Sequence, residues 1–171
     1  MWTLICVSIA FAIYLIYNGF AIRLFGIPKS LSDTFYLYKQ KKNWLRILFP
    51  IMMISLVILL LPAWLEISAG TSLQFLAFLA SAGIMFTGAA PAFMKSNLDN
   101  KVHTYSALAA AVFALLWVIF VSHMWWIIPV WLVITALIAI LTKSVKKSLV
   151  FWLETVAFLS TFISIIGYYF L

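Results

Sequence analysis

The lysine and arginine residues of this 171-residue chain are confined to three short stretches that alternate with long apolar segments. The stretches cover residues 23–46, 95–101 and 143–147 and hold all eleven basic residues. None occurs around residues 66–72 or 122–124, before the first stretch, or after the third. Because Lys and Arg beside membrane-spanning helices stay on the cytoplasmic side, this alternation predicts six spans in a cell membrane, with the N-terminus and the C-terminus both outside the cytoplasm.

The composition excludes an ordinary soluble domain, since 67% of the residues are hydrophobic and only 9% are charged. Residues 1–171 are therefore expected to form a single integral membrane domain. The net charge of +7 lies beside apolar runs, so it favours membrane lipid, with anionic headgroups on the cytoplasmic side, over nucleic acid as a partner. The one cysteine, Cys6, excludes an intrachain disulfide, and no motif indicates a cofactor.

The lengths of the apolar runs predict the fold. Crossing a hydrocarbon core of about 30 Å takes about 20 residues of helix. Runs of this length lie near residues 2–23, 45–65, 72–94, 102–122, 125–142 and 149–170. The predicted fold class is an all-α, polytopic membrane protein, a bundle of six transmembrane helices.

The connection of residues 24–44 is the only one long enough for structure of its own. Ser30 and Asp33 follow Pro28 at the spacing of a helix-capping box, which predicts a short helix lying on the inner membrane surface. Its apolar side chains would face the acyl chains and its lysines the headgroups; these are Leu31, Phe35 and Tyr38, and Lys39, Lys41 and Lys42. An ordinary basic loop is the alternative.

Tryptophans and small residues indicate where the spans end and how they pack. Trp64, Trp125 and Trp126 are expected at the outer boundary of the membrane and Trp44 at the inner one. Small residues let helices approach closely in lipid. The third and fourth spans are therefore expected to form the tight centre of the bundle, through Ala77, Ser81, Gly88, Ala107, Ala110, Ala111 and Ala114. Such faces can also join chains, which leaves a homo-oligomer or a membrane partner protein open.

Glu154 is the first candidate for a functional residue. It lies seven residues beyond Lys147, about 10 Å of helix rise into an apolar span, and ionisable groups at such depth usually face a cavity or a partner. A stripe of small and polar residues follows it at helical spacing and should face protein; its members are Ala157, Thr161, Ser164 and Tyr168. The alternatives are that Glu154 reaches the inner surface or pairs structurally with Arg23 or Arg46.

Pro91 follows Thr87 and Gly88 near the inner end of the third span, where its ring removes one helical hydrogen bond and disturbs the carbonyl of Thr87. Thr87, Asn18 and Glu154 lie at similar depths, so three spans offer polar groups at one level. Freed carbonyls at membrane depth can coordinate cations, and Gly88 with Pro91 would form a hinge. A kink that only shapes the packing is the alternative.

His103 follows Asp99 and Asn100, either of which can cap the fourth span, so its imidazole is expected in the first turn near the inner surface. It is a candidate ligand-binding or proton-relaying residue, and an interfacial polar group is the alternative. His123 lies at the opposite end of the same span, about 30 Å away, so one chain cannot bring both to the same metal. This argues against a zinc hydrolase, and no metal site is predicted.

These residues favour a protein that binds or translocates a small solute, a cation or a proton through a polar pocket in the cytoplasmic half of the bundle. The ligand-binding residues of this hypothesis are Glu154, Thr87, Gly88, Asn18 and His103. A second hypothesis is a non-enzymatic scaffold whose bundle and basic inner surface recruit partners or anionic lipid. The weakest is a lipid-modifying enzyme using Glu154, Asp99 and His103, since no nucleophile has a recognisable base and orienting acid beside it.

Overall fold

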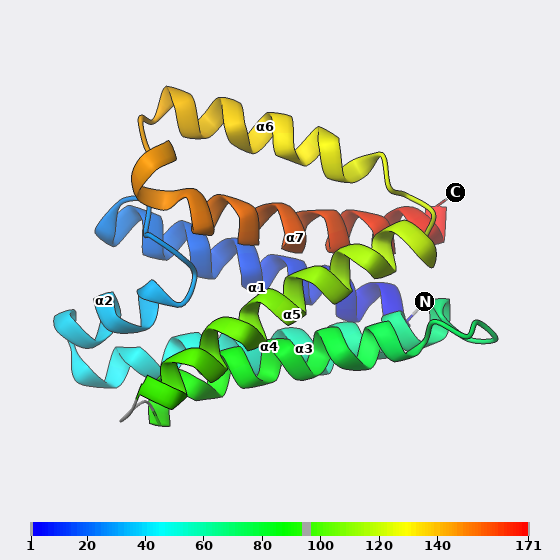
Figure 1. Ribbon diagram of the computed structural model, residues 1–171, viewed down its shortest axis with the longest axis horizontal. Coiled ribbons are helices and arrows are strands. Elements are labelled where there is room, and N and C mark those ends of the chain that lie inside the picture. The colour runs from blue at the N-terminus through cyan, green and yellow to red at the C-terminus, as the bar shows by residue number, and fades with distance from the viewer. Residues whose placement is uncertain (1, 94–96, 171) are drawn as a thin grey trace.

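The computed structural model describes residues 2–93 and 97–170, and the side chains of residues 2–89 and 101–170 (Figure 1). Within these residues the chain is all-helical and contains no β-strand, as predicted. The helices are α1 (Trp2–Phe25), α2 (Asp33–Lys41), the short 3₁₀ helix η1 (Asn43–Ile47), α3 (Leu48–Ile67), α4 (Phe75–Phe93), α5 (Asn97–Phe120), α6 (Ile127–Leu141) and α7 (Val145–Phe170).

Four of the helical segments are long and apolar enough to cross a membrane. They are Trp2–Phe25, Asn43–Ile67, Lys101–Phe120 and Val145–Phe170. The other two predicted spans correspond to shorter apolar helices, Phe75–Ala89 and Ile127–Leu141. Every predicted span thus contains a helix. The helix α4 has 19 residues and α6 has 15, so α6 falls short of the length that a single crossing ordinarily needs.

The long helices all run between the same two ends of the molecule (Figure 1). One end carries α2 and the turn between α6 and α7, whereas the other carries both termini and the turns that follow α3 and α5. Lys39, Lys41 and Lys42 lie at the first of these ends, which we call the basic end, and so do Lys143 and Lys146. The charge-poor connections lie at the end that carries the termini.

The helices pack in a series in which α1 contacts α3, α3 contacts α4, α4 contacts α5, and α7 contacts α5, α6 and α1. The contact between α4 and α5 is the most extensive. A Cβ atom on Gly83 would lie 2.8 Å from the backbone nitrogen of Ala110 and from the carbonyl oxygen of Ser106. Only glycine lets the two backbones approach this closely, so the tight centre expected at α4 and α5 is present, with Gly83 at its closest point.

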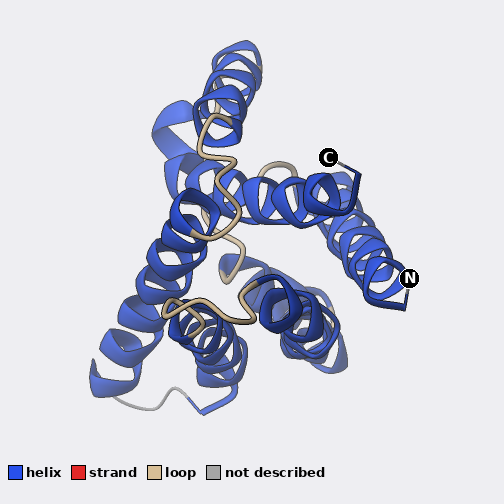
Figure 2. Cartoon of the chain, turned by 90° about the vertical axis from the view of Figure 1, so that its right-hand side faces the viewer, coloured by secondary structure: helices blue, strands red, loops and turns tan. Residues whose placement is uncertain are grey.

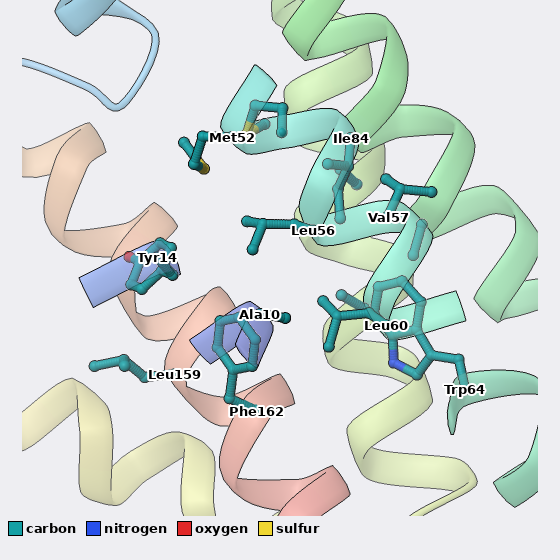
Figure 3. Packing of buried hydrophobic residues seen from close by; sticks show 14 of the residues in the cluster. Ala10, Tyr14, Met52, Leu56, Val57, Leu60, Trp64, Ile84, Leu159 and Phe162 are labelled. Atoms are coloured by element: carbon teal, nitrogen blue, oxygen red, sulfur yellow. The ribbon is translucent and has the colours of Figure 1, made fainter. Parts of the chain in front are cut away.

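The core is formed where α1, α3 and α7 meet (Figure 3). Tyr14 and Phe162 face Leu56 and Leu60 there, and all four side chains are buried. Large apolar side chains on the outside of the bundle are exposed instead, including Ile16 at 72% and Ile58 at 65%. Such a surface suits helices that face hydrocarbon rather than water.

The expectation that Trp64 anchors the membrane boundary is wrong. Its side chain is only 1% exposed and its ring centroid lies 6.3 Å from that of Trp117 on α5. The indole of Trp117 donates a hydrogen bond of 2.7 Å to Ser68 Oγ, which in turn donates to the carbonyl of Trp64. Packing between α3 and α5 therefore outweighs the preference of an indole for the interface. Trp44, Trp125 and Trp126 are exposed, as an anchor requires.

The short helix α2 exists, but its apolar face is turned toward protein. Leu31, Phe35 and Tyr38 are at most 3% exposed, because α2 folds back on α1 and places the ring of Tyr38 between those of Tyr17 and Phe25. Burial raises the pKa of Tyr38 to about 12. The expectation that Leu31, Phe35 and Tyr38 face the acyl chains is therefore wrong, because these side chains pack against protein.

The predicted capping pair lies just ahead of α2, whose N-cap residue is Ser32 and makes no side-chain capping hydrogen bond. The backbone N–H of Asp33 donates to Ser30 Oγ at 3.1 Å, and the carboxylate of Asp33 accepts from the backbone N–H of Lys29 at 3.2 Å. In a capping box the carboxylate of Asp33 would instead accept from the backbone N–H of Ser30. The lysines Lys39, Lys41 and Lys42 are exposed, as expected. On α5 the helix begins at Asn97, so Asp99 and Asn100 lie in its first turn and not ahead of it.

Candidate functional site

The connection between α1 and α2 is fastened to the beginning of α7. Ser148 has non-helical backbone angles, with φ −128° and ψ 27°, and this kink divides α7 near its start. The backbone N–H of Phe151 donates to the carbonyl of Lys29 at 3.0 Å, and Ser148 Oγ donates to the carbonyl of Ile27 at 3.3 Å. The kink thus directs polar groups of α7 toward residues that come more than 110 positions earlier.

Glu154 makes the third of these contacts. Its Oε2 atom accepts a hydrogen bond of 2.7 Å from the backbone N–H of Leu31. Arg23 and Arg46 are both exposed, and no ion pair is formed by Glu154 with any residue whose side chain is described. Glu154 therefore does not pair with Arg23 or Arg46. Its partner is the backbone N–H of Leu31, in the connection between α1 and α2.

Two cavities share Glu154 as a lining residue. The smaller one has a volume of about 40 Å³, room for about three water molecules, and lies between α3, α4, α5 and α7 with Thr87, Thr161 and Trp64 along its wall. The larger one, which we call the groove, has a volume of about 880 Å³ and lies between α5, α6, α7 and the connection before α2. Ala107 and Ala111 line both cavities, so the two are neighbours along α5.

The groove is polar at one end and apolar along its length. Its polar lining comes from Lys29, Ser30, Ser32, Asp33, Tyr36, His103, Thr104 and Glu154. Its apolar lining includes Leu108 and Val112 on α5, Leu132 on α6, and Val150 and Leu153 on α7. Apart from Glu154, the polar residues come from the connection before α2, from α2 itself and from the start of α5. Along α7 the apolar residues Val150 and Leu153 precede Glu154.

His103 is the second ionisable group in this region. Its side chain is 8% exposed and lines the groove, and its imidazole hydrogen-bonds to the backbone of Thr87 on α4. Its Nδ1 atom is buried and has no partner. His103 therefore lies between the backbone of α4 and the groove, and its Nδ1 atom is not exposed to the groove.

Asn18 and Gly88 have other positions than the pocket hypothesis assigned to them. Asn18 lines neither cavity, and its amide donates to the carbonyl of Tyr14 one turn earlier on α1. A Cβ atom on Gly88 would lie 2.6 Å from Cβ of Met53, so Gly88 permits the close approach of α3 and α4. The helix α4 continues through Gly88 and Pro91 to Phe93, and the side chain of Pro91 lies outside the described residues.

Sequence reasoning missed the part of the groove that comes from the connection before α2. Asp33 was interpreted only as a capping residue, whereas its side chain also lines the groove. Lys29 was assigned only to the basic stretch, and it lines the groove as well. A polar segment next to Pro28 signalled structure there, but only the fold brings that segment to α7.

The part of the chain described by the structure contains no group of three His, Cys, Asp and Glu side chains that could share a metal ion. The three residues of the enzyme hypothesis are not all available for comparison, since the side chain of Asp99 lies outside the described residues. No protein-family model, no curated protein and no solved structure matches this chain.

Proposed function

We propose that this chain is a six-span membrane protein whose basic end lies in the cytoplasm and whose termini both lie outside. The grouping of Lys39 to Lys42 and Lys143 to Lys147 at one end supports this orientation. The helix α6, with 15 residues, extends about 22 Å. A helix shorter than the hydrocarbon core crosses by local thinning of the bilayer and by flanking residues that reach the interface, and the exposed Trp125 and Trp126 precede α6.

We further propose that the protein binds and translocates a small cationic solute or a proton at Glu154. The observation that carries this function is that one carboxylate, without a cationic side chain paired to it in the described structure, borders both cavities. A charged group at membrane depth is costly unless it is compensated. A cation or a proton in either cavity would supply the compensation that Arg23 and Arg46 do not.

The two cavities define a path for such a solute. The groove reaches Glu154 from the basic end, and the small cavity continues from Glu154 toward Leu60 and Trp64 near the opposite end. Glu154 would be ionised while it holds the solute and protonated when empty, so that no bare charge remains. Thr87 and Thr161, which line the small cavity, would offer hydroxyl oxygens along it.

The test uses purified protein in liposomes and three probes: ethanolamine, sodium and a proton gradient. We expect uptake of at least one probe above that of empty liposomes, and its loss in Glu154→Gln. Glu66→Gln is the matched control, because Glu66 is exposed at the end of α3 that lies away from the groove. Equal uptake by Glu154→Gln and the wild type, or no uptake of any probe by the wild type, would overturn the proposal.

The scaffold hypothesis remains as a second candidate because Lys39, Lys41 and Lys42 are exposed together at the basic end. Such a cluster attracts anionic lipid with about 1 kcal/mol for each charge near the surface. Replacing the three lysines by glutamine would then abolish recruitment of anionic lipid or partners while Glu154→Gln left it unchanged. The transport hypothesis expects the opposite pattern.

A further inference from the structure

We infer that the groove binds a phospholipid with an ethanolamine headgroup, which enters sideways from the inner leaflet between α5 and α6. This inference rests on the proposed function, since it identifies the cation at Glu154 as the ammonium group of a lipid. Three properties of the groove support it: its opening, its polar and apolar lining, and the charges at its polar end.

The groove opens along the side of the bundle. The helix α6 packs on α7 and has no comparable contact with α5, and α5 runs obliquely away from α7 toward the basic end (Figure 1). In the end-on view of Figure 2, α6 stands at the top and is set apart from the helices at the bottom. The lining side chains of Leu108, Leu132 and Leu153 are 59%, 42% and 51% exposed, so the groove is open to whatever surrounds α5 and α6.

In a membrane-spanning bundle the surroundings of these side chains are acyl chains. The lining from Leu108, Val112, Leu132, Val150 and Leu153 contains no polar group that a water-soluble ligand would use. The volume of about 880 Å³ is near the upper end of the range for small-molecule sites, about 300–1,000 Å³. An acyl chain fits the chemistry of this part of the groove.

The polar end of the groove has the charges of a site for a zwitterionic headgroup. Glu154 and Asp33 supply two carboxylates, and Lys29 supplies one ammonium group. An ethanolamine headgroup presents the complementary set, an ammonium group with three N–H donors and a phosphate. The ammonium would lie at Glu154 and Asp33, and the phosphate at Lys29.

The carboxylate of Glu154 favours a headgroup that donates hydrogen bonds. One of its oxygens accepts from the backbone N–H of Leu31, and its other oxygen requires a further N–H or O–H donor. A choline headgroup carries the positive charge but has no N–H to donate, and a glycerol headgroup donates but has no positive charge, so these two lipids separate the contributions.

The experiment measures lipid retained by the purified protein after incubation with ethanolamine, choline or glycerol phospholipids of the same acyl chains, by native mass spectrometry. We expect the wild type to retain the ethanolamine lipid about tenfold more than the other two. Leu132→Trp fills the groove and should lower this retention by about tenfold. Val133→Trp is the matched control, since Val133 is the next residue on α6, is exposed and does not line the groove.

The outcomes separate this inference from the proposed function. Equal retention of the three lipids by the wild type, or unchanged retention in Leu132→Trp, would overturn the lipid inference. Free ethanolamine does not need the apolar part of the groove, so its Glu154-dependent binding should survive in Leu132→Trp. If Glu154→Gln binds free ethanolamine as well as the wild type does, the proposed function itself fails.

Discussion

The carboxylate of Glu154 and the backbone N–H of Leu31 form a 2.7 Å hydrogen bond between residues 123 positions apart. This contact holds the connection between α1 and α2 against α7 and so closes one wall of the groove. Glu154 therefore has a structural task alongside the proposed binding of a cation. Different substitutions of Glu154 are needed to distinguish its hydrogen bond to Leu31 from the proposed binding of a cation.

Replacing Glu154 by alanine should destabilise the connection before α2. The backbone N–H of Leu31 would lose its acceptor, and an unsatisfied buried donor costs about 1–3 kcal/mol. Glutamine keeps an acceptor oxygen, so Glu154→Gln should retain most of the contact. Hydrogen exchange of the Leu31 amide measures this directly: we expect faster exchange in Glu154→Ala than in Glu154→Gln. Equal exchange rates in the two variants would contradict the structural role.

Gly83→Ala should separate α4 from α5. The added Cβ would lie 2.8 Å from backbone atoms of both Ala110 and Ser106, which cannot move independently of their helix, and such overpacking costs about 1–3 kcal/mol. Gly19→Ala is the matched control, because no atom lies within 4 Å of a Cβ at Gly19 and alanine favours helix by up to about 1 kcal/mol. Thermal unfolding in detergent should show a lower midpoint for the first variant and no decrease for the second.

Trp117→Phe should weaken the contact of α5 with α3. The change removes the indole donor to Ser68 Oγ, and a hydrogen bond of this kind contributes about 0.5–1.5 kcal/mol. Trp125→Phe serves for comparison, since Trp125 is 61% exposed. The free energy of unfolding should decrease only for Trp117→Phe. A similar decrease in both variants would mean that ring size, and not the hydrogen bond, controls stability.

The orientation in the membrane can be tested by labelling single cysteines. In a Cys6→Ser background, Lys41→Cys at the basic end should be protected from a membrane-impermeant maleimide in intact cells. Ser72→Cys, on the exposed connection between α3 and α4, should react. The reason is the retention of Lys and Arg in the cytoplasm, and the reverse labelling pattern would exclude the proposed orientation.

The positions of the apolar helices followed from the sequence because hydrophobic length and flanking charge are local properties. The same holds for the buried stripe of α7, where Ala157, Thr161 and Ser164 are at most 5% exposed. Tyr168, the last member of that stripe, is 48% exposed. Helical spacing indicates a face, but not how far along the helix a partner covers it.

The site was less predictable because it depends on contacts between distant segments. Glu154, Thr87 and His103 were recognised as polar groups in apolar helices, and each lines at least one of the two cavities. Lys29 and Asp33 line the groove because the kink at Ser148 brings the start of α7 to the connection before α2. No proline or glycine in the sequence indicates that kink. Trp64 was misplaced for a related reason, since its burial depends on Trp117, 53 residues later.

Because α6 packs on α7 and makes few other contacts, the width of the groove depends on one helix pair. A small rotation of α6 about that pair would widen or narrow the entrance without disturbing the packing of α1, α3, α4 and α5. The proposed lipid site would therefore accommodate ligands of different thickness by a movement of one wall, while the charged end at Glu154 stays fixed.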